Sequence, residues 1–149
     1  MKMKEVCTPD AEWCGRETSA LEAARLMRHK HVGDLVVVDD PDGARTPIGV
    51  VTDRDLVIEI MAKGVDPSTV TVAELVRTPV VIADETEDAG PVIERMRAHG
   101  VRRIPVVDHR GSVTGIVTLD DLLKCMIEEA GKLVGIVAKG HDREQRARR

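Results

Sequence analysis

Two short motifs, Thr52-x-x-Asp55 and Thr118-x-x-Asp121, have the residue types and the spacing of a ligand site. Each motif follows an apolar, β-branched run, so each is expected where a strand ends and a helix begins. Free backbone N–H groups and the positive end of the helix dipole favour an anion at such a junction. The threonine hydroxyl could bind the same anion, and the aspartate carboxylate could accept hydrogen bonds from two hydroxyls of a sugar.

The same four residues also fit an ordinary N-terminal helix cap, in which the threonine hydroxyl accepts a backbone hydrogen bond and meets no ligand. Finding the motif twice does not decide between the two roles, because a duplicated sequence copies a cap as readily as a binding site. One residue can also serve as both a cap and a ligand contact. The motifs alone therefore leave both roles open.

Basic residues near the motifs could neutralise a phosphate. Arg54 lies within the first motif, and His99, Arg102 and Arg103 form a group ahead of the second. Contacts between arginine and phosphate can be bidentate, which makes them strong and geometrically specific. The alternative is that these charged side chains only flank a helix end and a strand.

Other residue combinations form no catalytic or metal-binding pattern. His29 and His31 are two residues apart and cannot share a helix face, and the spacing of Cys7 and Cys14 does not match a zinc knuckle. Those two cysteines could pair under oxidation. The chain shows no Walker-type glycine-rich loop, no clustered carboxylates and no nucleophile set beside a histidine. We therefore expect neither a metal centre nor an enzyme.

Composition limits the class of protein that can carry these motifs. Of 149 residues, 42% are hydrophobic and 22 are valine, whereas Trp13 is the only aromatic residue. A core built from valine and other aliphatic residues favours strands covered by helices. A net charge of −4 and the lack of stacking residues argue against nucleic-acid binding. There is no apolar run near the roughly 20 residues of a membrane span, no secretory signal and no C-x-x-C pair, so we expect a reduced, cytoplasmic protein without membrane contact.

The elements that must position the motifs come in two copies. A shift of 69 residues aligns Ala20–Asp39 with Ala89–Asp108, and seven of the aligned pairs are identical, from Ala20/Ala89 to Asp39/Asp108. With a slightly shorter shift, Gly49–Leu56 falls on Gly115–Leu122 with five identities in eight positions. Matching at a fixed offset indicates a duplicated unit.

Each copy predicts the order strand, helix, strand, strand, helix, which is an α/β (α+β) fold. Ser19 and Glu22 form a capping box at the first helix, and Asp88 is the equivalent cap in the second copy. The run Leu35–Val38 reads as a buried strand. We divide the chain into repeat one (1–66), repeat two (67–130) and a C-terminal tail (131–149).

The tail contains an apolar run, Leu133–Ala138, that fits a helix or a strand equally well. This run needs a surface to cover, and a dimer contact is one candidate. The charged end from His141 to Arg149 is expected to be a solvated, frayed terminus, with an electrostatic contact to another protein as the alternative.

The repeated unit resembles the cystathionine β-synthase (CBS) domain family. The resemblance rests on GVVTDRDL at 49–56, GIVTLDDL at 115–122 and RRIPVVD at 102–108, and it covers roughly residues 3–129. It implies a stand-alone tandem pair, often called a Bateman module, in which two repeats are related by pseudo-two-fold symmetry and sheets pack against helices. The first copy departs from the pattern, because Gly33-Asp34-Leu35-Val36 carries an acid and lacks the proline.

The family binds adenosine-containing ligands in clefts between the repeats, with the aspartate on the ribose and the threonine on the phosphate. The resemblance therefore implies Thr52 and Asp55 for the first site and Thr118 and Asp121 for the second. It also implies an apolar bed for the adenine ring, made of Trp13, Cys14, Leu35 and Val36 in the first site and of Ile82, Ala83, Ile104 and Pro105 in the second. Trp13 could instead be a core residue. Because Asp34 replaces a basic partner, a monophosphate or a neutral ligand is favoured in the first site.

The function implied by the resemblance is that of a cytosolic energy or metabolite sensor in signal transduction, which binds an adenosine nucleotide without catalysing a reaction. AMP is the favoured ligand, with ADP, ATP, NAD and S-adenosylmethionine left open. We expect a homodimer whose ligand occupancy changes its contact with a target protein. The alternatives are a structural dimerisation scaffold with degenerate pockets and, less favoured, a nucleotide-processing enzyme.

Overall fold

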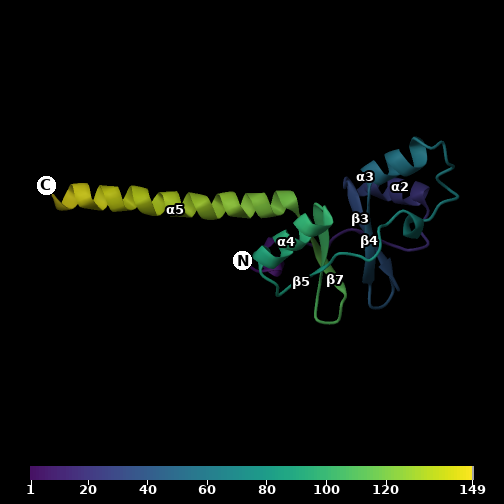
Figure 1. Ribbon diagram of the computed structural model, residues 1–149, viewed down its shortest axis with the longest axis horizontal. Helices are drawn as coiled ribbons and strands as arrows, with labels where there is room; N and C mark the ends of the chain where they lie inside the picture. The colour runs from purple at the N-terminus through teal and green to yellow at the C-terminus, as the bar shows by residue number, and fades with distance from the viewer. Residues whose placement is uncertain (149) are drawn as a thin grey trace.

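The computed structural model describes residues 1–148 as two small sheets that carry helices, with one long helix leaving the body (Figure 1). The first repeat contributes β2 (Trp13–Gly15), α2 (Ala20–Lys30), β3 (Asp34–Asp39), β4 (Thr46–Thr52) and α3 (Asp53–Leu56), which continues as the π-helical η1 (Val57–Met61). The second repeat contributes β5 (Ala83–Asp84), α4 (Ala89–His99), β6 (Arg103–Val107), β7 (Val113–Thr118) and α5 (Leu119–Ala147). The predicted duplicated order and the mixed α+β fold are therefore confirmed.

The two sheets are built in the same way. In each repeat a short parallel pair, β2 with β3 or β5 with β6, is followed by an antiparallel pair, β3 with β4 or β6 with β7. Asp34 is opposite Thr52 in one antiparallel pair, and Arg103 is opposite Thr118 in the other. A further strand, β1 (Thr8–Pro9), adds to the edge of the second sheet, antiparallel to β7. Each motif threonine therefore ends a hairpin, as the sequence predicts.

The ends of the first helix in each repeat also follow the duplication. The Ser19 hydroxyl accepts from the Glu22 backbone N–H at 3.1 Å, and the Glu22 carboxylate accepts from the Ser19 backbone N–H at 3.0 Å, so the predicted capping box is confirmed. Asp88 occupies the equivalent N-cap position of α4, but its side chain accepts no capping hydrogen bond. The two helices end in left-handed residues, His31 (φ 56°) and Gly100 (φ 62°), which are also 69 positions apart.

The segments that lead into each repeat cross over to the other one. Residues of α1 (Met3–Val6) pack in the core of the second repeat with Ile104, Val117 and Leu122. Conversely, Val72 of the 3₁₀ turn η2 (Val72–Glu74) packs in the core of the first repeat. The crossing keeps the duplication, because the isolated bridges join Lys2 to Asp88 and Ser19 to Thr71.

A glycine makes room for each crossing segment. A Cβ atom built on Gly49 would lie 2.4 Å from the Cβ atom of Val76, which follows η2. A Cβ atom built on Gly115 would lie 2.6 Å from the carbonyl oxygen of Thr8 in β1. No side chain fits at either distance, so the glycine that begins each repeated motif is required by the close approach of the lead-in segment.

A shared core joins the two sheets. Val36 and Val38 of β3 pack against Val113 and Ile116 of β7, and the partly buried Trp13 lies beside them. The guanidinium carbon of Arg45 lies 5.8 Å from the centre of the Trp13 ring, a cation–π distance. Trp13 therefore belongs to the packing between the repeats.

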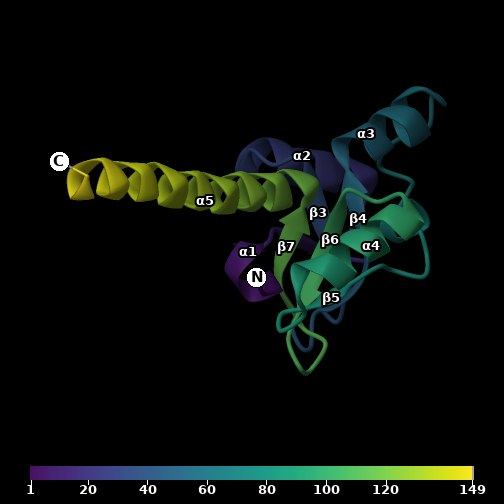
Figure 2. The ribbon, with the colours of Figure 1, turned by 60° about the vertical axis from the view of Figure 1, so that its left-hand side comes forward.

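The structure answers both questions about the tail, because α5 runs without a break from Leu119 to Ala147. Its first turns pack on the second repeat through Leu122, and the rest extends away from the body (Figures 1 and 2). The apolar run Leu133–Ala138 is helical. The expected frayed end is also helical up to Ala147, because intrahelical hydrogen bonds continue to the C-cap at Arg148.

Two further expectations concern cysteines and membranes. Cys7, Cys14 and Cys125 are free thiols, so the disulfide considered between Cys7 and Cys14 is not formed. Burial raises the pKa of the Cys14 thiol to about 11, which keeps it protonated and unreactive at neutral pH. Among the described residues, no helix combines the length and the apolar character that crossing a membrane requires.

Candidate functional site

Both Thr-x-x-Asp motifs form reciprocal helix caps. The Thr52 hydroxyl accepts from the Asp55 backbone N–H at 3.2 Å, and Asp55 Oδ2 accepts from the Thr52 backbone N–H at 2.9 Å. Thr118 and Asp121 make the same two hydrogen bonds at the same distances. The capping role considered for these residues is therefore confirmed, and any ligand role is added to it.

The two caps differ in where the threonine hydroxyl donates its proton. Thr118 Oγ1 donates to Asp121 Oδ2 at 2.8 Å, so its proton is engaged inside the motif. Thr52 Oγ1 donates to no described residue, and Asp55 Oδ1 accepts from none. The first motif therefore keeps one donor and one acceptor for a ligand.

The first motif opens into a cleft made by both repeats, which we call the inter-repeat cleft. Its volume is about 260 Å³, close to the lower end of the roughly 300–1,000 Å³ typical of small-molecule sites. One wall comes from the end of β4 and the start of α3, and the opposite wall from the segment before β5 and the loop from α4 to β6. The lining residues are Gly49, Val50, Thr52, Asp55, Leu75, Arg77, Pro79, Val80, Val81, Gly100, Val101, Arg102, Arg103 and Pro105.

The chemistry of the inter-repeat cleft has three parts. Arg77, Arg102 and Arg103 supply positive charge, and the first two are exposed without an ion-pair partner among the described residues. Aliphatic side chains and Pro105 supply an apolar wall. Thr52 and Asp55 supply the polar groups. Such a cleft can hold a flat apolar ring, a group with adjacent hydroxyls and an anion.

Arg103 is tied to the first repeat by an ion pair. Arg103 Nε lies 2.9 Å from Asp34 Oδ2, and both side chains are partly buried. Burial raises the pKa of Asp34, Arg103 lowers it, and the nearby Asp53 and Asp121 carboxylates raise it again. The net result is a pKa above the ordinary value, because desolvation outweighs the attraction of Arg103.

The second motif lies close to a carboxylate of the first repeat and to the Cys7 thiol. Asp34 feels the charge of Asp121, and the pKa of the Cys7 thiol is raised by burial, then by Asp121 and Glu85. Asp121 thus has the Asp34 carboxylate near it, which Arg103 pairs, whereas Asp55 shares its cleft with three arginines. We therefore expect an anionic ligand beside Asp55 rather than beside Asp121.

The structure does not assemble the two sets of residues expected from the sequence. Thr52 and Asp55 face Arg102, Arg103 and Pro105, which belong to the other repeat. The side chains of the other expected apolar residues are in the cores or between the sheets, with Leu35, Val36, Ala83 and Ile104 fully buried, Cys14 nearly so and Trp13 partly so. Arg54 is exposed and does not line the cleft. The residues of the two repeats share one cleft because the segments that lead into the repeats cross over.

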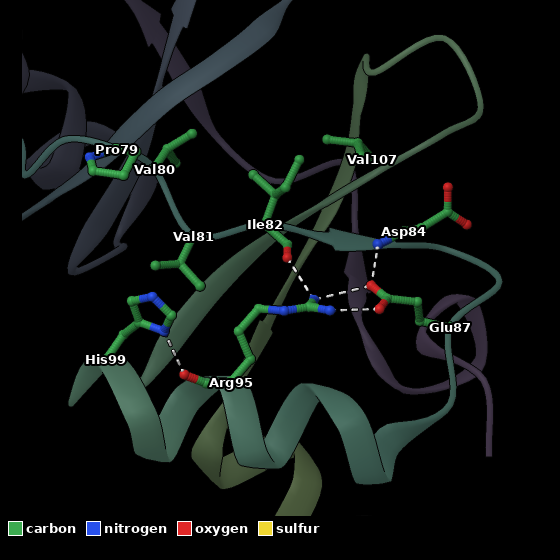
Figure 3. A pocket seen from close by; sticks show the side chains of 9 residues that line it. All are labelled: Pro79, Val80, Val81, Ile82, Asp84, Glu87, Arg95, His99 and Val107. Atoms are coloured by element: carbon green, nitrogen blue, oxygen red, sulfur yellow. Dashed lines mark hydrogen bonds and ion pairs between the residues drawn. The ribbon is translucent and has the colours of Figure 1, made fainter.

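Ile82 and His99 lie in a neighbouring hollow of about 410 Å³ (Figure 3), which shares the segment Pro79–Val81 with the inter-repeat cleft. Arg95 crosses this hollow and donates to the Ile82 carbonyl oxygen at 2.8 Å and to both carboxylate oxygens of Glu87 at 2.6 and 3.0 Å. His99 Nδ1 is 2.9 Å from the Arg95 carbonyl oxygen. The polar groups of the hollow are satisfied by each other, which indicates a structural clamp.

Nine of the cleft residues were not expected from the sequence, and among them Arg77, Val80 and Val81 form one segment. They precede β5, whereas the sequence reasoning placed the apolar bed at Ile82 and Ala83, the end of that lead-in strand. A signal was present in the apolar pair Val80-Val81 next to Pro79. Arg77 had no such signal, because nothing in the sequence says that its segment crosses the first repeat.

Comparison with protein families and curated proteins gives a consistent result. The family model described as CBS domain matches residues 3–62 and 72–128. The chain is 35% identical to YlbB of Bacillus subtilis over 146 residues, 97% of this chain and 96% of that protein. It is 36% identical to hypoxic response protein 1 of Mycobacterium tuberculosis over 117 residues, 78% of each. It spans about half (53%) of MK0525 of Methanopyrus kandleri, with 36% identity over 106 residues.

The fold of this chain matches the folds of several solved structures. A crystal structure of hypoxic response protein I with two coordinated zinc ions has a TM-score of 0.72 and 30% identity, covering 83% of this chain and 98% of that one. PAE2072 of Pyrobaculum aerophilum, complexed with AMP, has a TM-score of 0.71 and 22% identity, covering 82% and 90%. The CBS domain pair of MJ0100, complexed with 5′-methylthioadenosine and S-adenosylmethionine, has a TM-score of 0.73 and 24% identity, covering 87% and 98%.

Proposed function

Because the chain belongs to the CBS domain family, as two such domains in tandem, we propose that it is a regulatory protein that binds an adenosine nucleotide in the inter-repeat cleft. The observation that carries the proposal is the meeting of Thr52 and Asp55 with Arg77 and Arg102 across one cleft. The protein responds to the nucleotide by a change in shape or contacts and does not convert it.

Each part of an adenosine monophosphate has a partner in the cleft. Asp55 Oδ1 accepts from the ribose hydroxyls, while Asp55 Oδ2 continues to cap α3. The Thr52 hydroxyl, Arg77 and Arg102 bind the phosphate by charge-assisted hydrogen bonds. The adenine ring lies against the apolar wall of the cleft, which is formed by Val80, Val81 and Pro105.

A monophosphate suits this cleft better than a triphosphate. Only two of the three arginines are without an ion-pair partner among the described residues, because Arg103 is bound to Asp34. The volume of about 260 Å³ also leaves little room beyond one nucleoside and one phosphate. AMP is therefore the favoured ligand. The complexes of PAE2072 with AMP and of MJ0100 with two adenosine compounds support an adenosine ligand in this fold.

Thermal unfolding with a panel of AMP, ADP, ATP, NAD and S-adenosylmethionine tests the proposal. At 100 times its dissociation constant, the true ligand adds about 2.7 kcal/mol to the free energy of unfolding, which raises the Tm by about 5–11 °C for a chain of this size. We expect the largest rise with AMP. We expect Asp55→Asn to abolish the rise and Asp121→Asn to leave it unchanged.

Asp121→Asn is the matched control, because both aspartates make the same capping hydrogen bond at 2.9 Å. The two variants therefore share the cost of a weakened cap. They differ in the cleft and in the hydrogen bond from Thr118 Oγ1, which only Asp121 accepts, so each variant is compared with its own ligand-free Tm. A rise that survives in Asp55→Asn, or no rise with any of the five compounds, would overturn the proposal and leave the dimerisation scaffold ahead. Turnover of AMP or ATP that depends on Asp55 would point to an enzyme.

A further inference from the structure

Eight of the thirteen large hydrophobic side chains that are exposed among the described residues lie on α5. Beyond its first turns the helix leaves the body, and Figures 1 and 2 show no other element beside it. Ile127, Leu133, Val134 and Val137 are 65–74% exposed. We call the apolar line along the helix, formed by Leu119, Leu123, Met126, Ile127, Ala130, Leu133, Val134 and Val137, the α5 stripe.

The α5 stripe has the spacing of a helix–helix seam. Leu119, Leu123, Met126, Ala130, Leu133 and Val137 are separated by four, three, four, three and four residues. Alternating steps of four and three place apolar residues at the a and d positions of consecutive heptads. This pattern fits one straight partner helix better than a flat surface.

An isolated α5 would be a poor helix in water. Gly131, Gly135 and Gly140 lie in its exposed half, and a Cβ atom on any of them would meet nothing within 4 Å. Each glycine is about 1 kcal/mol less favourable than alanine inside a helix. Helical stability in proteins comes mostly from packing of the apolar face, so this helix needs a partner along its stripe.

The distribution of charge along α5 favours a second copy of the same helix as the partner. Residues 119–131 carry four acidic side chains and one basic one, whereas residues 132–148 carry five basic side chains and two acidic ones. Two copies of α5 laid antiparallel place the acidic half of each on the basic half of the other, and parallel copies would place like charges together. The helix is thus electrostatically complementary to itself in one direction only.

The base of α5 offers a receiving surface for the far end of the partner. Ile93, Met96 and Val101 of the second repeat line an apolar groove of about 510 Å³ together with Leu122, Leu123 and Met126 of α5. The groove is continuous with the α5 stripe, because Leu123 and Met126 belong to both. In an antiparallel pair, the apolar residues Leu133 and Val137 of the second copy approach this groove.

We propose that α5 is the interface with a second copy of this chain, paired antiparallel along the stripe Leu119–Val137. The paired stretch is 19 residues long, or about 28 Å at about 1.5 Å per residue. The pair is centred near Ala130, between the midpoint of the stripe at position 128 and the change in the sign of the charge after Gly131. This pairing does not depend on the ligand assigned to the inter-repeat cleft.

Sedimentation of the full chain tests whether the stripe associates. We expect a dimer for the wild type, and a dissociation constant raised roughly 30-fold or more by Leu133→Glu with Val137→Glu. Gly131→Glu with Gly135→Glu is the matched control, since it adds the same charge to the same stretch away from the stripe. A monomeric wild type, or equal weakening by both variants, would overturn the proposal. Circular dichroism verifies that the variants remain folded.

Spin-label distances test the orientation, in a background with Cys7→Ser, Cys14→Ala and Cys125→Ser. Labels at Ala130→Cys should lie close together across the pair. Labels at Glu144→Cys, 14 residues further along the seam, should lie about 40 Å apart in an antiparallel pair. Short distances at both positions would mean a parallel pair, and no defined distance at either would mean no pair, so both results would contradict the proposal.

Discussion

Asp34 and Arg103 occupy equivalent positions of the two repeats, and they bind each other at 2.9 Å. Equivalent residues meet in this way only near the pseudo-two-fold axis. The same residue in both repeats would place like charges in contact, whereas opposite charges form an ion pair. This one difference also places an arginine in the cleft beside Asp55 and an aspartate near Asp121.

Asp34→Asn should change how stability depends on pH. Burial raises the pKa of Asp34 above its ordinary value of 3.8, so the folded chain holds this proton more tightly than the unfolded chain does. The associated stability is present below the ordinary pKa and is lost as pH rises through the higher folded-state pKa. Measured by urea denaturation, the wild type should lose stability relative to Asp34→Asn over that range.

Glu87→Gln is a control of opposite sign. The hydrogen bonds from Arg95 lower the pKa of Glu87, so its contribution is present above the ordinary value of 4.5 and is lost as pH falls. The wild type should therefore lose stability relative to Glu87→Gln on acidification. A difference between wild type and Asp34→Asn that stays constant with pH, or that moves in the Glu87 direction, would show that burial does not govern Asp34.

At the scale of the element, equivalent positions do not always carry equivalent interactions. Ser19 and Asp88 are both N-caps, but only Ser19 accepts a capping hydrogen bond. The Asp88 carboxylate instead lies 3.0 Å from the Lys2 ammonium and 3.9 Å from the N-terminal amine. Asp88 therefore fastens the crossing N-terminal segment to α4.

Ser19→Ala should destabilise the protein more than Asp88→Ala. Removing a capping hydroxyl costs about 1 kcal/mol, which lowers the Tm by about 2–4 °C. The ion pairs of Asp88 are mostly exposed and contribute little. Thermal unfolding of both variants in low and high salt compares them. A larger loss for Asp88→Ala, or a salt-dependent loss for Ser19→Ala, would contradict this account.

Most elements could be predicted because local signals and the duplication agree. Ser19 with Glu22 marks a helix start, Leu35–Val38 marks a buried strand, and the fixed offset transfers both to the second repeat. The apolar run Leu133–Ala138 could not be assigned to a helix or a strand, because six residues fit the periodicity of either one. It became helix by continuing a helix already started at Leu119.

At the scale of the whole molecule, the motif residues were predictable but their partners were not. Thr52 and Asp55 are visible in the sequence, and so are Arg102 and Arg103. Which of them share a cleft depends on the crossing of the lead-in segments, a tertiary contact without a local signal. Grouping residues by repeat therefore assembled each expected site from one half of the chain.

The crossing also predicts that the two repeats unfold together. Val38 lies in the cluster that joins the sheets, and α1 and η2 each complete the core of the opposite repeat. Val38→Ala should lower the free energy of unfolding on the order of 2 kcal/mol while keeping a single transition. Calorimetry checks this by comparing the calorimetric and van't Hoff enthalpies. Two separate transitions would mean that the repeats are independent.

The crossing sets an order of events when the chain leaves the ribosome. The first repeat has all of its core once residues up to Val76 have emerged. Met3 and Val6 emerge before this core, but their partners Ile104 and Val117 follow more than 95 residues later. The side chains of Met3 and Val6 must therefore stay exposed to water until β6 and β7 have been synthesised. We therefore expect α1 to be protected by a chaperone during synthesis.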